Sequence, residues 1–479
     1  MISFLISLAA LILGYMTYGR IIERIFGPDD RKTPALAHPD GVDYIAMPSW
    51  KVFMIQFLNI AGTGPIFGAI MGAWFGPASF LWIVLGCIFA GSVHDYLSGM
   101  MSLRHDGAVL PELIGKYMGN TIRIIMLIFS IFLLLMVGAV FVYSPAMILS
   151  GIGGSEIMWY VVIFIYYIIA TLLPIDRIIG KIYPFFAIAL IFMALGLFVA
   201  LIIKMPAIPE IWDIGSRMDS WMTAQTHNGT DLLGMKDYLS KNSLFPAMFI
   251  TIACGAISGF HATQSPLMAR CLKSEKLGRP IFYGSMITEG IVALVWAAVS
   301  SWFFYSGGWR EVLPQEAVNE FLAQVGNTDG KSLIQYFSAP AVVKLVCSSW
   351  LGVVGGILAM LGVVAAPITS GDTALRSARL IIADFFKFDQ KPTIKRLMIA
   401  VPMFSSVLLL LIWQLANPNG FNALWQYFGW SNQTLSVFTL WTITIFLYKC
   451  KKCYWVTLIP AIFMTAVSLT FIIHQILNI

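Results

Sequence analysis

Long apolar stretches are the feature that most constrains the fold of this chain. Most reach the roughly 20 residues that an α-helix needs to cross a hydrocarbon core about 30 Å thick. They are continuously apolar, whereas the strands of a membrane barrel alternate in polarity at every second residue. We therefore expect an all-α polytopic membrane protein with about 12 transmembrane helices. The predicted spans are 2–19, 48–75, 78–102, 121–149, 156–174, 182–203, 244–268, 281–305, 341–370, 396–413, 422–448 and 455–475.

The low content of charged residues supports this fold class. Of the 479 residues 58% are hydrophobic and only 11% are charged, and the mean hydropathy is +0.81. A soluble domain usually has about 25% charged residues. Because so little charge could not coat a water-facing surface of this size, lipid must be the solvent for much of the chain.

The lysines and arginines are divided unevenly between the loops on the two sides of the membrane. With twelve spans, 23 of the 30 lie on one side and seven on the other. Positive residues gather in cytoplasmic loops, so the first side is predicted to be cytoplasmic and both termini to lie outside the cytoplasm. The net charge of +6 is then a topology signal, and we expect no nucleic-acid partner. Because Arg20 and Arg24 follow the first apolar run, we expect a retained helix and not a signal peptide.

Two predicted spans contain residues that weaken a helix. Proline lacks a backbone donor and glycine tolerates non-helical dihedral angles, so a membrane helix can unwind at either. Unwound backbone at membrane depth persists only where it is buried in protein or lines a cavity. For each segment alone, tight packing of small residues is an equal alternative. The first segment holds Gly62, Thr63 and Gly64 before a proline, and the second holds Gly255, Ser258, Gly259 and His261.

The positions of these two segments predict an internal repeat. They lie in the second and seventh spans and cross the membrane in opposite directions, as expected for two inverted repeats of five helices. We predict an extra helix in residues 1–30, repeats at 48–203 and 244–448, and a second extra helix at 455–479. Broken helices at matching positions of two halves point to a transporter binding site.

Four ionisable residues lie inside apolar spans, where charge is costly and is a sign of function. His94 and Asp95 lie in the third span, Glu289 in the eighth and His261 in the second interrupted span. Desolvation favours the protonated form of a carboxylate, which suits it to carrying a proton. An ion pair with a cytoplasmic arginine is the alternative for Asp95, and a satisfied hydrogen-bonding role is the alternative for His261. Glu289 has no basic neighbour at helical spacing, so we expect it to be the coupling carboxylate.

The predicted ninth span ends in a second set of polar residues. Thr369 and Ser370 carry hydroxyl oxygens, which suit a hard cation such as sodium. Asp372 and Arg376 are spaced as an i,i+4 structural pair on a helix. A phosphate-binding loop, a zinc-protease motif and a paired thiolate cluster are missing from the sequence. We therefore expect no enzymatic activity, no cofactor and no metal.

Several segments resemble the carbon starvation protein A (CstA) family of peptide and pyruvate transporters. This resemblance implies a place among the amino acid–polyamine–organocation transporters and their LeuT-like five-plus-five fold. It also implies location in a bacterial inner membrane, an extracellular lid at residues 306–340, and import of peptides or pyruvate with protons during nutrient scavenging. The matching segments are 33–44, 60–65, 104–107, 244–246, 249–261, 372–379, 424–425 and 429–433.

Together these features predict a proton-coupled importer of a small carboxylate-bearing nutrient, a short peptide or pyruvate. Backbone N–H groups at Gly62, Thr63 and Gly64 would hold the carboxylate at the N-terminus of a half-helix. The opposite wall would be shaped by Gly255, Ser258 and His261, and the proton would be carried by Glu289 or Asp95, with His94 beside it. Two alternatives stay open: a sodium-coupled symporter using Thr369 and Ser370, and a membrane sensor that binds the same solute without moving it.

Overall fold

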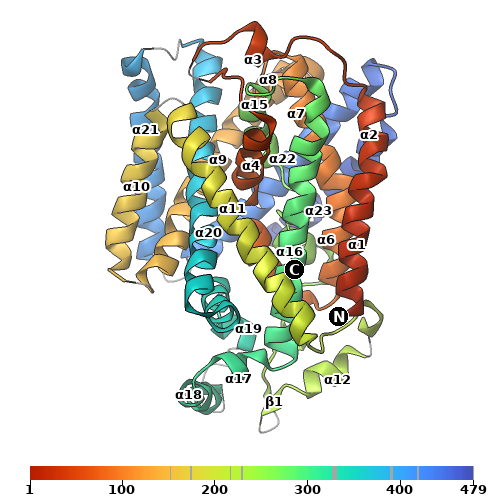
Figure 1. The fold of residues 1–479 in the computed structure, drawn as a ribbon, viewed down its shortest axis with the longest axis vertical. Helices are drawn as coiled ribbons and strands as arrows, with labels where there is room; N and C mark the ends of the chain where they lie inside the picture. The colour runs from red at the N-terminus through yellow and green to blue at the C-terminus, as the bar shows by residue number, and fades with distance from the viewer. Residues whose placement is uncertain are drawn as a thin grey trace.

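The computed structural model describes residues 1–41, 43–151, 153–172, 175–215, 217–227, 230–325, 332–388, 392–417 and 420–477. The helices stand side by side as a bundle (Figure 1). Three predicted segments, 156–174, 306–340 and 455–479, extend over residues 173–174, 326–331 and 478–479, which lie outside the described residues.

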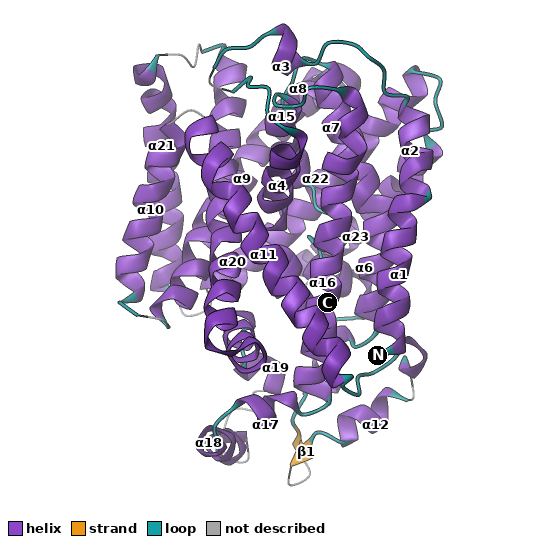
Figure 2. Ribbon diagram, viewed as in Figure 1, coloured by secondary structure: helices purple, strands orange, loops and turns teal. Residues whose placement is uncertain are grey.

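The chain is helical almost throughout, with one short antiparallel hairpin, β1 (Thr226–His227) and β2 (Thr230–Asp231), in its described part (Figure 2). The helices before the second interrupted span are α1 (Ile2–Met16), α2 (Tyr18–Phe26), α3 (Pro34–Ala37), α4 (Ser49–Ala61), α5 (Gly64–Met71), α6 (Ala78–Gly86), α7 (Ser92–Arg104), α8 (Leu110–Met118), α9 (Asn120–Ser150), α10 (Glu156–Leu172), α11 (Ile175–Lys204), α12 (Met218–Thr223) and α13 (Met235–Lys241). Those that follow are α14 (Leu244–Thr251), α15 (His261–Ala269), α16 (Gly284–Tyr305), α17 (Gly308–Val312), α18 (Gln315–Val325), α19 (Leu333–Tyr336), α20 (Ala339–Phe386), α21 (Thr393–Ala416), α22 (Gly420–Lys449) and α23 (Trp455–Leu477).

The structure confirms an all-α, multi-pass membrane protein. Nine helical segments among the described residues are long and apolar enough to span a membrane, so the predicted number of twelve is not established. Three predicted spans are missing from these nine for different reasons. The described part of α10 is short, α14 and α15 are two separate pieces, and α22 carries the polar residues Ser431, Asn432 and Gln433 in its middle.

Both predicted broken helices are confirmed. The first is interrupted between α4 and α5, where Gly62 has φ 29° and ψ −148°, a backbone conformation that residues with a side chain rarely adopt. The second is interrupted between α14 and α15, where residues 252–260 are not helical. We call residues 62–63 break 1 and residues 252–260 break 2.

The broken helices form the core of the bundle. In the segment Ser49–Phe75, which contains break 1, 89% of the most apolar window is buried, against 33% for α23. The helix α4 packs against α11, α15, α16 and α20, so protein surrounds it on several sides. The outer helices present apolar side chains such as Ile128, Leu409 and Ile459 on their exposed faces, as expected for contact with lipid.

One helix is longer than the sequence indicated. The predicted span 341–370 belongs to α20, which continues to Phe386 and changes direction at Gly352 (φ 64°, ψ −171°). It packs along α9 and α11. The residues Thr369, Ser370, Asp372 and Arg376 therefore lie inside one continuous helix and do not end it.

The N-terminus lies at the same end of the bundle as α12, α17 and α18 (Figure 1). Its ammonium group forms an ion pair with Glu210 in the segment after α11. Whether this end faces away from the cytoplasm stays a prediction from the charge distribution.

Candidate functional site

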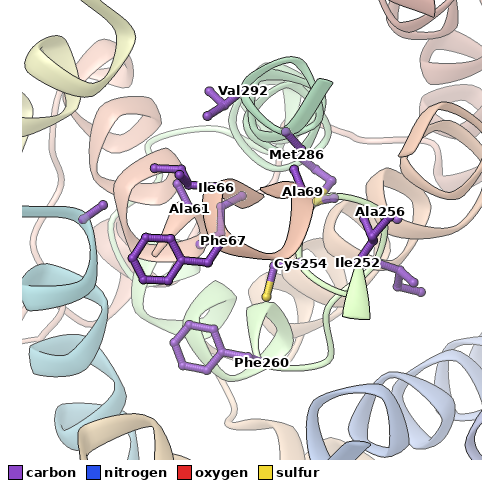
Figure 3. Close-up of a cluster of buried hydrophobic side chains, with 14 of the residues drawn as sticks. Ala61, Ile66, Phe67, Ala69, Ile252, Cys254, Ala256, Phe260, Met286 and Val292 are labelled. Atoms are coloured by element: carbon purple, nitrogen blue, oxygen red, sulfur yellow. The ribbon is translucent and has the colours of Figure 1, made fainter. Parts of the chain in front are cut away.

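Break 2 lies directly against α5, the half-helix that begins after break 1. A Cβ atom added to Gly64, the first residue of α5, would overlap the side chain of Cys254 in break 2. One turn later, a Cβ on Gly68 would lie 2.9 Å from the carbonyl oxygen of Thr251, closer than Cβ atoms normally approach. Side chains from α5, break 2 and α16 meet in one buried cluster (Figure 3). Glycine is thus required on α5 because break 2 passes so close to it.

A narrow gap lies where the start of α5, break 2 and α22 meet. Its volume is about 10 Å³, which is close to the space that one water molecule needs. A ligand larger than water would therefore require the breaks to separate. The gap is lined by Gly64, Ile250, Thr251, Ala253, Cys254, Trp425, Phe428 and Gly429.

Side chains from α6 and α22 hold the unwound backbone around break 2. The indole nitrogen of Trp82 donates to the carbonyl of Ile252 at 2.9 Å. The side-chain amide of Gln433 donates to the carbonyl of Phe249 in α14 at 3.1 Å and to the carbonyl of Ile257 in break 2 at 3.2 Å. These bonds satisfy carbonyl groups that the interrupted helix cannot pair with its own N–H groups.

Asn432 on α22 holds the end of break 2. Its side-chain oxygen accepts hydrogen bonds from the Ser258 hydroxyl at 3.0 Å and from the Phe260 N–H at 2.7 Å. Its backbone carbonyl accepts the Gly259 N–H at 3.2 Å. Ser258, predicted to shape a substrate wall, thus bonds to Asn432, while Gly255 packs against Ala293 on α16. Substrate contact by these two residues stays a prediction.

Break 1 receives one side-chain hydrogen bond among the described residues, and it comes from α20. The Ser370 hydroxyl donates to the carbonyl of Leu58 at 3.1 Å. The Thr369 hydroxyl instead donates within its own helix, to Ala365 at 2.8 Å. Of the predicted cation pair, Ser370 is therefore the residue that reaches the break.

Four buried ionisable side chains form a cluster beside break 2, in which His94, Asp95 and His261 are hydrogen-bonded and Glu289 lies next to His261. His94, Asp95, His261 and Glu289 are all fully buried. The two carboxylate oxygens of Asp95 lie 2.8 Å from His94 Nδ1 and 2.8 Å from His261 Nδ1. On the far side of the ring, His261 Nε2 lies 3.5 Å from Glu289 Oε2. The sequence singled out all four residues, and the fold brings them together from α7, α15 and α16.

This arrangement corrects two interpretations of the sequence. Asp95 accepts from two histidines, so its alternative pairing with a cytoplasmic arginine is wrong. Glu289 has no basic neighbour on its own helix but faces His261 from another. An ionised Asp95 can only accept, so Nδ1 of each ring donates to it and Nε2 of His261 faces Glu289.

A π-helical turn at Cys87–Gly91 precedes α7 and sets the position of Asp95. An extra residue in a helical turn is frequent at functional sites, because it reorients the side chains that follow. A Cβ on Gly91 would overlap the backbone carbonyl of Ala256, so this turn also touches break 2.

Asp372 and Arg376 interact through their charges, but the direct contacts of each are made with other segments of the chain. Asp372 accepts a hydrogen bond of 2.5 Å from the Tyr183 hydroxyl of α11. Arg376 forms an ion pair of 3.8 Å with Asp43 and donates a hydrogen bond of 2.7 Å to the carbonyl of Ala170. The Asp372 carboxylate thus links α20 to α11, and the charge of Arg376 acts on it as well.

The side chains that bond to break 2 were not predicted from the sequence. Trp82, Asn432 and Gln433 had no predicted role, although 429–433 was part of the family resemblance. The available signal was the adjacent amide side chains of Asn432 and Gln433 in the middle of the largely apolar run 422–448. Within the described part of the chain, His, Cys, Asp and Glu side chains form no group of three or more placed to hold a metal ion.

Comparison with known proteins agrees with this geometry. The family model described as carbon starvation protein CstA matches residues 1–155 and 143–471. An uncharacterized membrane protein of Haemophilus influenzae is 43% identical over 64% of this chain and 91% of its own length. The peptide transporter CstA of Escherichia coli is 25% identical over 97% of this chain and 79% of its own length. That of Bacillus subtilis is 28% identical over 90% and 82%, respectively.

Solved structures share the fold at low sequence identity. A manganese transporter of Eremococcus coleocola matches 91% of this chain and 90% of its own, with a TM-score of 0.54 and 13% identity. A Na⁺-coupled sialic acid symporter matches 98% and 96%, with a TM-score of 0.52 and 13% identity. The five-plus-five LeuT-like fold is therefore confirmed. With its fold, its broken helices and its match to the family model in agreement, the chain belongs to the carbon starvation protein CstA family.

Proposed function

We propose that this protein is a secondary active importer of a small carboxylate-bearing nutrient, a short peptide or pyruvate, coupled to protons. Curated relatives along almost the whole chain are named peptide transporters. A transporter role without enzymatic chemistry fits both these names and the two broken helices in a membrane bundle.

The observation that carries the proposal is the chain Asp95–His261–Glu289. The Glu289 carboxylate and the His261 imidazole are both fully buried and lie 3.5 Å apart without a hydrogen bond, so a closer approach of the two would let them share one proton. Asp95 fixes the orientation of the His261 ring through the 2.8 Å bond to Nδ1. Glu289 is then the group that takes the proton from one side of the membrane and releases it to the other, and His261 is its partner.

The same chain links protonation to the gap between the breaks. His261 is the first residue of α15 and directly follows break 2. Moving the shared proton changes the attraction between α15 and α16, so it biases how break 2 sits against α5. The solute carboxylate would enter between the breaks and meet the N-terminus of α5, where Gly64 borders the gap and the N–H groups of residues 62–64 face an anion.

The substitution Glu289→Gln tests the coupling role, because glutamine imitates the protonated carboxylate but cannot release a proton. We expect it to abolish uptake driven by a proton gradient in proteoliposomes while counterflow exchange continues. Asp237→Asn is the matched control, since Asp237 is an exposed carboxylate paired with Lys241 on α13. Wild-type, pH-dependent uptake by Glu289→Gln would move the coupling role away from this residue.

Sodium coupling is the second candidate, because Ser370 reaches the carbonyl of Leu58 at break 1. Replacing sodium with choline on both sides of the membrane separates the two mechanisms. We expect uptake to be unchanged by choline. Loss of uptake in choline, together with its loss in Ser370→Ala, would favour a sodium symporter. Binding of solute without any exchange would favour the nutrient sensor.

A further inference from the structure

Three polar side chains around break 1 have no role in the mechanism above. Asn59 and Gln56 lie on α4, about one and two turns before the break, and Thr63 lies in the break itself. All three are fully buried. Both polar atoms of each amide and the Thr63 hydroxyl lack a hydrogen-bond partner among the described residues.

Buried polar side chains without hydrogen-bond partners lower the stability of the folded protein. A buried polar atom without a partner costs about 1–3 kcal/mol, so native proteins rarely carry several close together without a use for them. Gln56 and Asn59 are three residues apart and therefore share one face of α4. Because α4 is packed between α11, α15, α16 and α20, this face does not open to lipid. These atoms are thus placed to bond with something that enters the bundle at break 1.

The chemistry of the three side chains limits which ligand can bond to them. None of them is charged, and each amide offers both a donor and an acceptor. A peptide bond offers the same pair and can satisfy both sides of an amide. A keto acid such as pyruvate is ionised at neutral pH and offers acceptors only, so it would leave the carbonyl oxygens of Gln56 and Asn59 unpaired.

We infer that Gln56, Asn59 and Thr63 form a recognition row for an uncharged amide group, so that the solute is a short peptide and not a keto acid. This inference rests on the proposed function and makes it more specific. The α5 N-terminus would take the carboxylate, and the recognition row would take the peptide bond next to it. Specificity of this kind is strong, because an analogue that cannot pair with the row leaves buried groups unmatched.

The test compares alanyl-alanine with alanyl-lactate, in which the peptide N–H is replaced by an ester oxygen. We expect the wild-type protein in nanodiscs to bind alanyl-alanine about tenfold more tightly, the effect of one buried hydrogen bond. Gln56→Leu and Asn59→Leu should bind both ligands with similar affinity and keep the wild-type melting temperature. Equal binding of both ligands by the wild type, or preserved discrimination in both variants, would overturn the inference. So would loss of folding in both variants, since the side chains would then be structural.

Pyruvate separates this inference from the proposed function. If pyruvate is accumulated in proteoliposomes and alanyl-alanine is not bound, the recognition row is refuted while the importer stands. If neither solute is bound or exchanged, both proposals fail. Accumulation of alanyl-alanine with discrimination lost in the two leucine variants supports both.

Discussion

The two breaks look alike in sequence but are held in different ways. The backbone around break 2 receives hydrogen bonds from Trp82, Asn432 and Gln433, which belong to α6 and α22. Break 1 receives the Ser370 hydroxyl, and the polar side chains next to it lack partners in the described part of the chain. Small residues and glycine mark both breaks. Break 2 is fixed by hydrogen bonds from neighbouring helices, whereas the polar side chains at break 1 remain able to bond to a ligand.

This difference assigns separate tasks to the two halves. A pre-organised break 2 provides a rigid wall and positions His261 against Asp95 and Glu289. A less constrained break 1 can change shape when a ligand pairs with it. In the proposed transport mechanism the first task would maintain the coupling geometry, and the second would allow binding to open and close the site.

The largest expected effect comes from making the same substitution at both breaks. Asn432→Leu removes the acceptor of the Ser258 hydroxyl and the Phe260 N–H, at a cost of about 1–3 kcal/mol for each unmatched donor. Asn59→Leu removes an amide without partners and should leave the melting temperature in detergent unchanged or raise it. Ser431→Ala is the control beside Asn432, because its buried hydroxyl has no partner among the described residues. Equal destabilisation by the two leucines would contradict the comparison.

The direct contact between the breaks gives the next largest effect. Gly64→Ala places a methyl group against Cys254, and overpacking of this kind typically costs about 1–3 kcal/mol. We expect transport to fall, and the double variant Gly64→Ala with Cys254→Gly to recover it. Gly153→Ala should be neutral, since an added Cβ there meets nothing within 4 Å. If the double variant is no better than Gly64→Ala, the breaks do not meet as described.

A smaller effect is expected at the end of the bundle where α13 packs against residues 72–75, which follow α5. Trp74 follows α5 and stacks on Tyr238 of α13, with ring centroids 4.1 Å apart and an angle of 12° between the rings. Such a pair contributes about 0.5–1.5 kcal/mol. In a variant whose other five cysteines are serine, Trp74→Ala should speed the labelling of Cys254 by an impermeant maleimide several-fold. The lipid-facing Trp413→Ala should not. Unchanged labelling in Trp74→Ala would show that this stack does not control access.

Much of the fold could be predicted from the sequence, because apolar runs and helix-weakening residues are local signals. The membrane class, both breaks and the inverted repeat follow from them. The number of spans was harder, since α14 and α15 are short and the polar middle of α22 makes it less apolar than a usual span. Those polar residues are the ones that hold break 2.

The candidate site was predicted as separate residues but not as an assembly. His94, Asp95, His261 and Glu289 were each visible as ionisable residues in apolar spans. Their pairing was not, because Asp95 and His261 are 166 residues apart and meet only in the fold. The hydrogen bond from Tyr183 to Asp372 was missed for the same reason, since Tyr183 comes from a distant helix. Residue spacing along the sequence predicts side-chain pairs within one helix but does not predict pairs between helices.

The most direct test of proton-coupled import is to measure proton movement when a solute gradient is the only driving force. Proteoliposomes containing a pH-sensitive dye are given external alanyl-alanine in sodium-free buffer with no initial pH difference. The account predicts acidification of the interior that depends on the peptide and is absent in Glu289→Gln. Peptide entry without acidification, or entry that requires sodium, would contradict it.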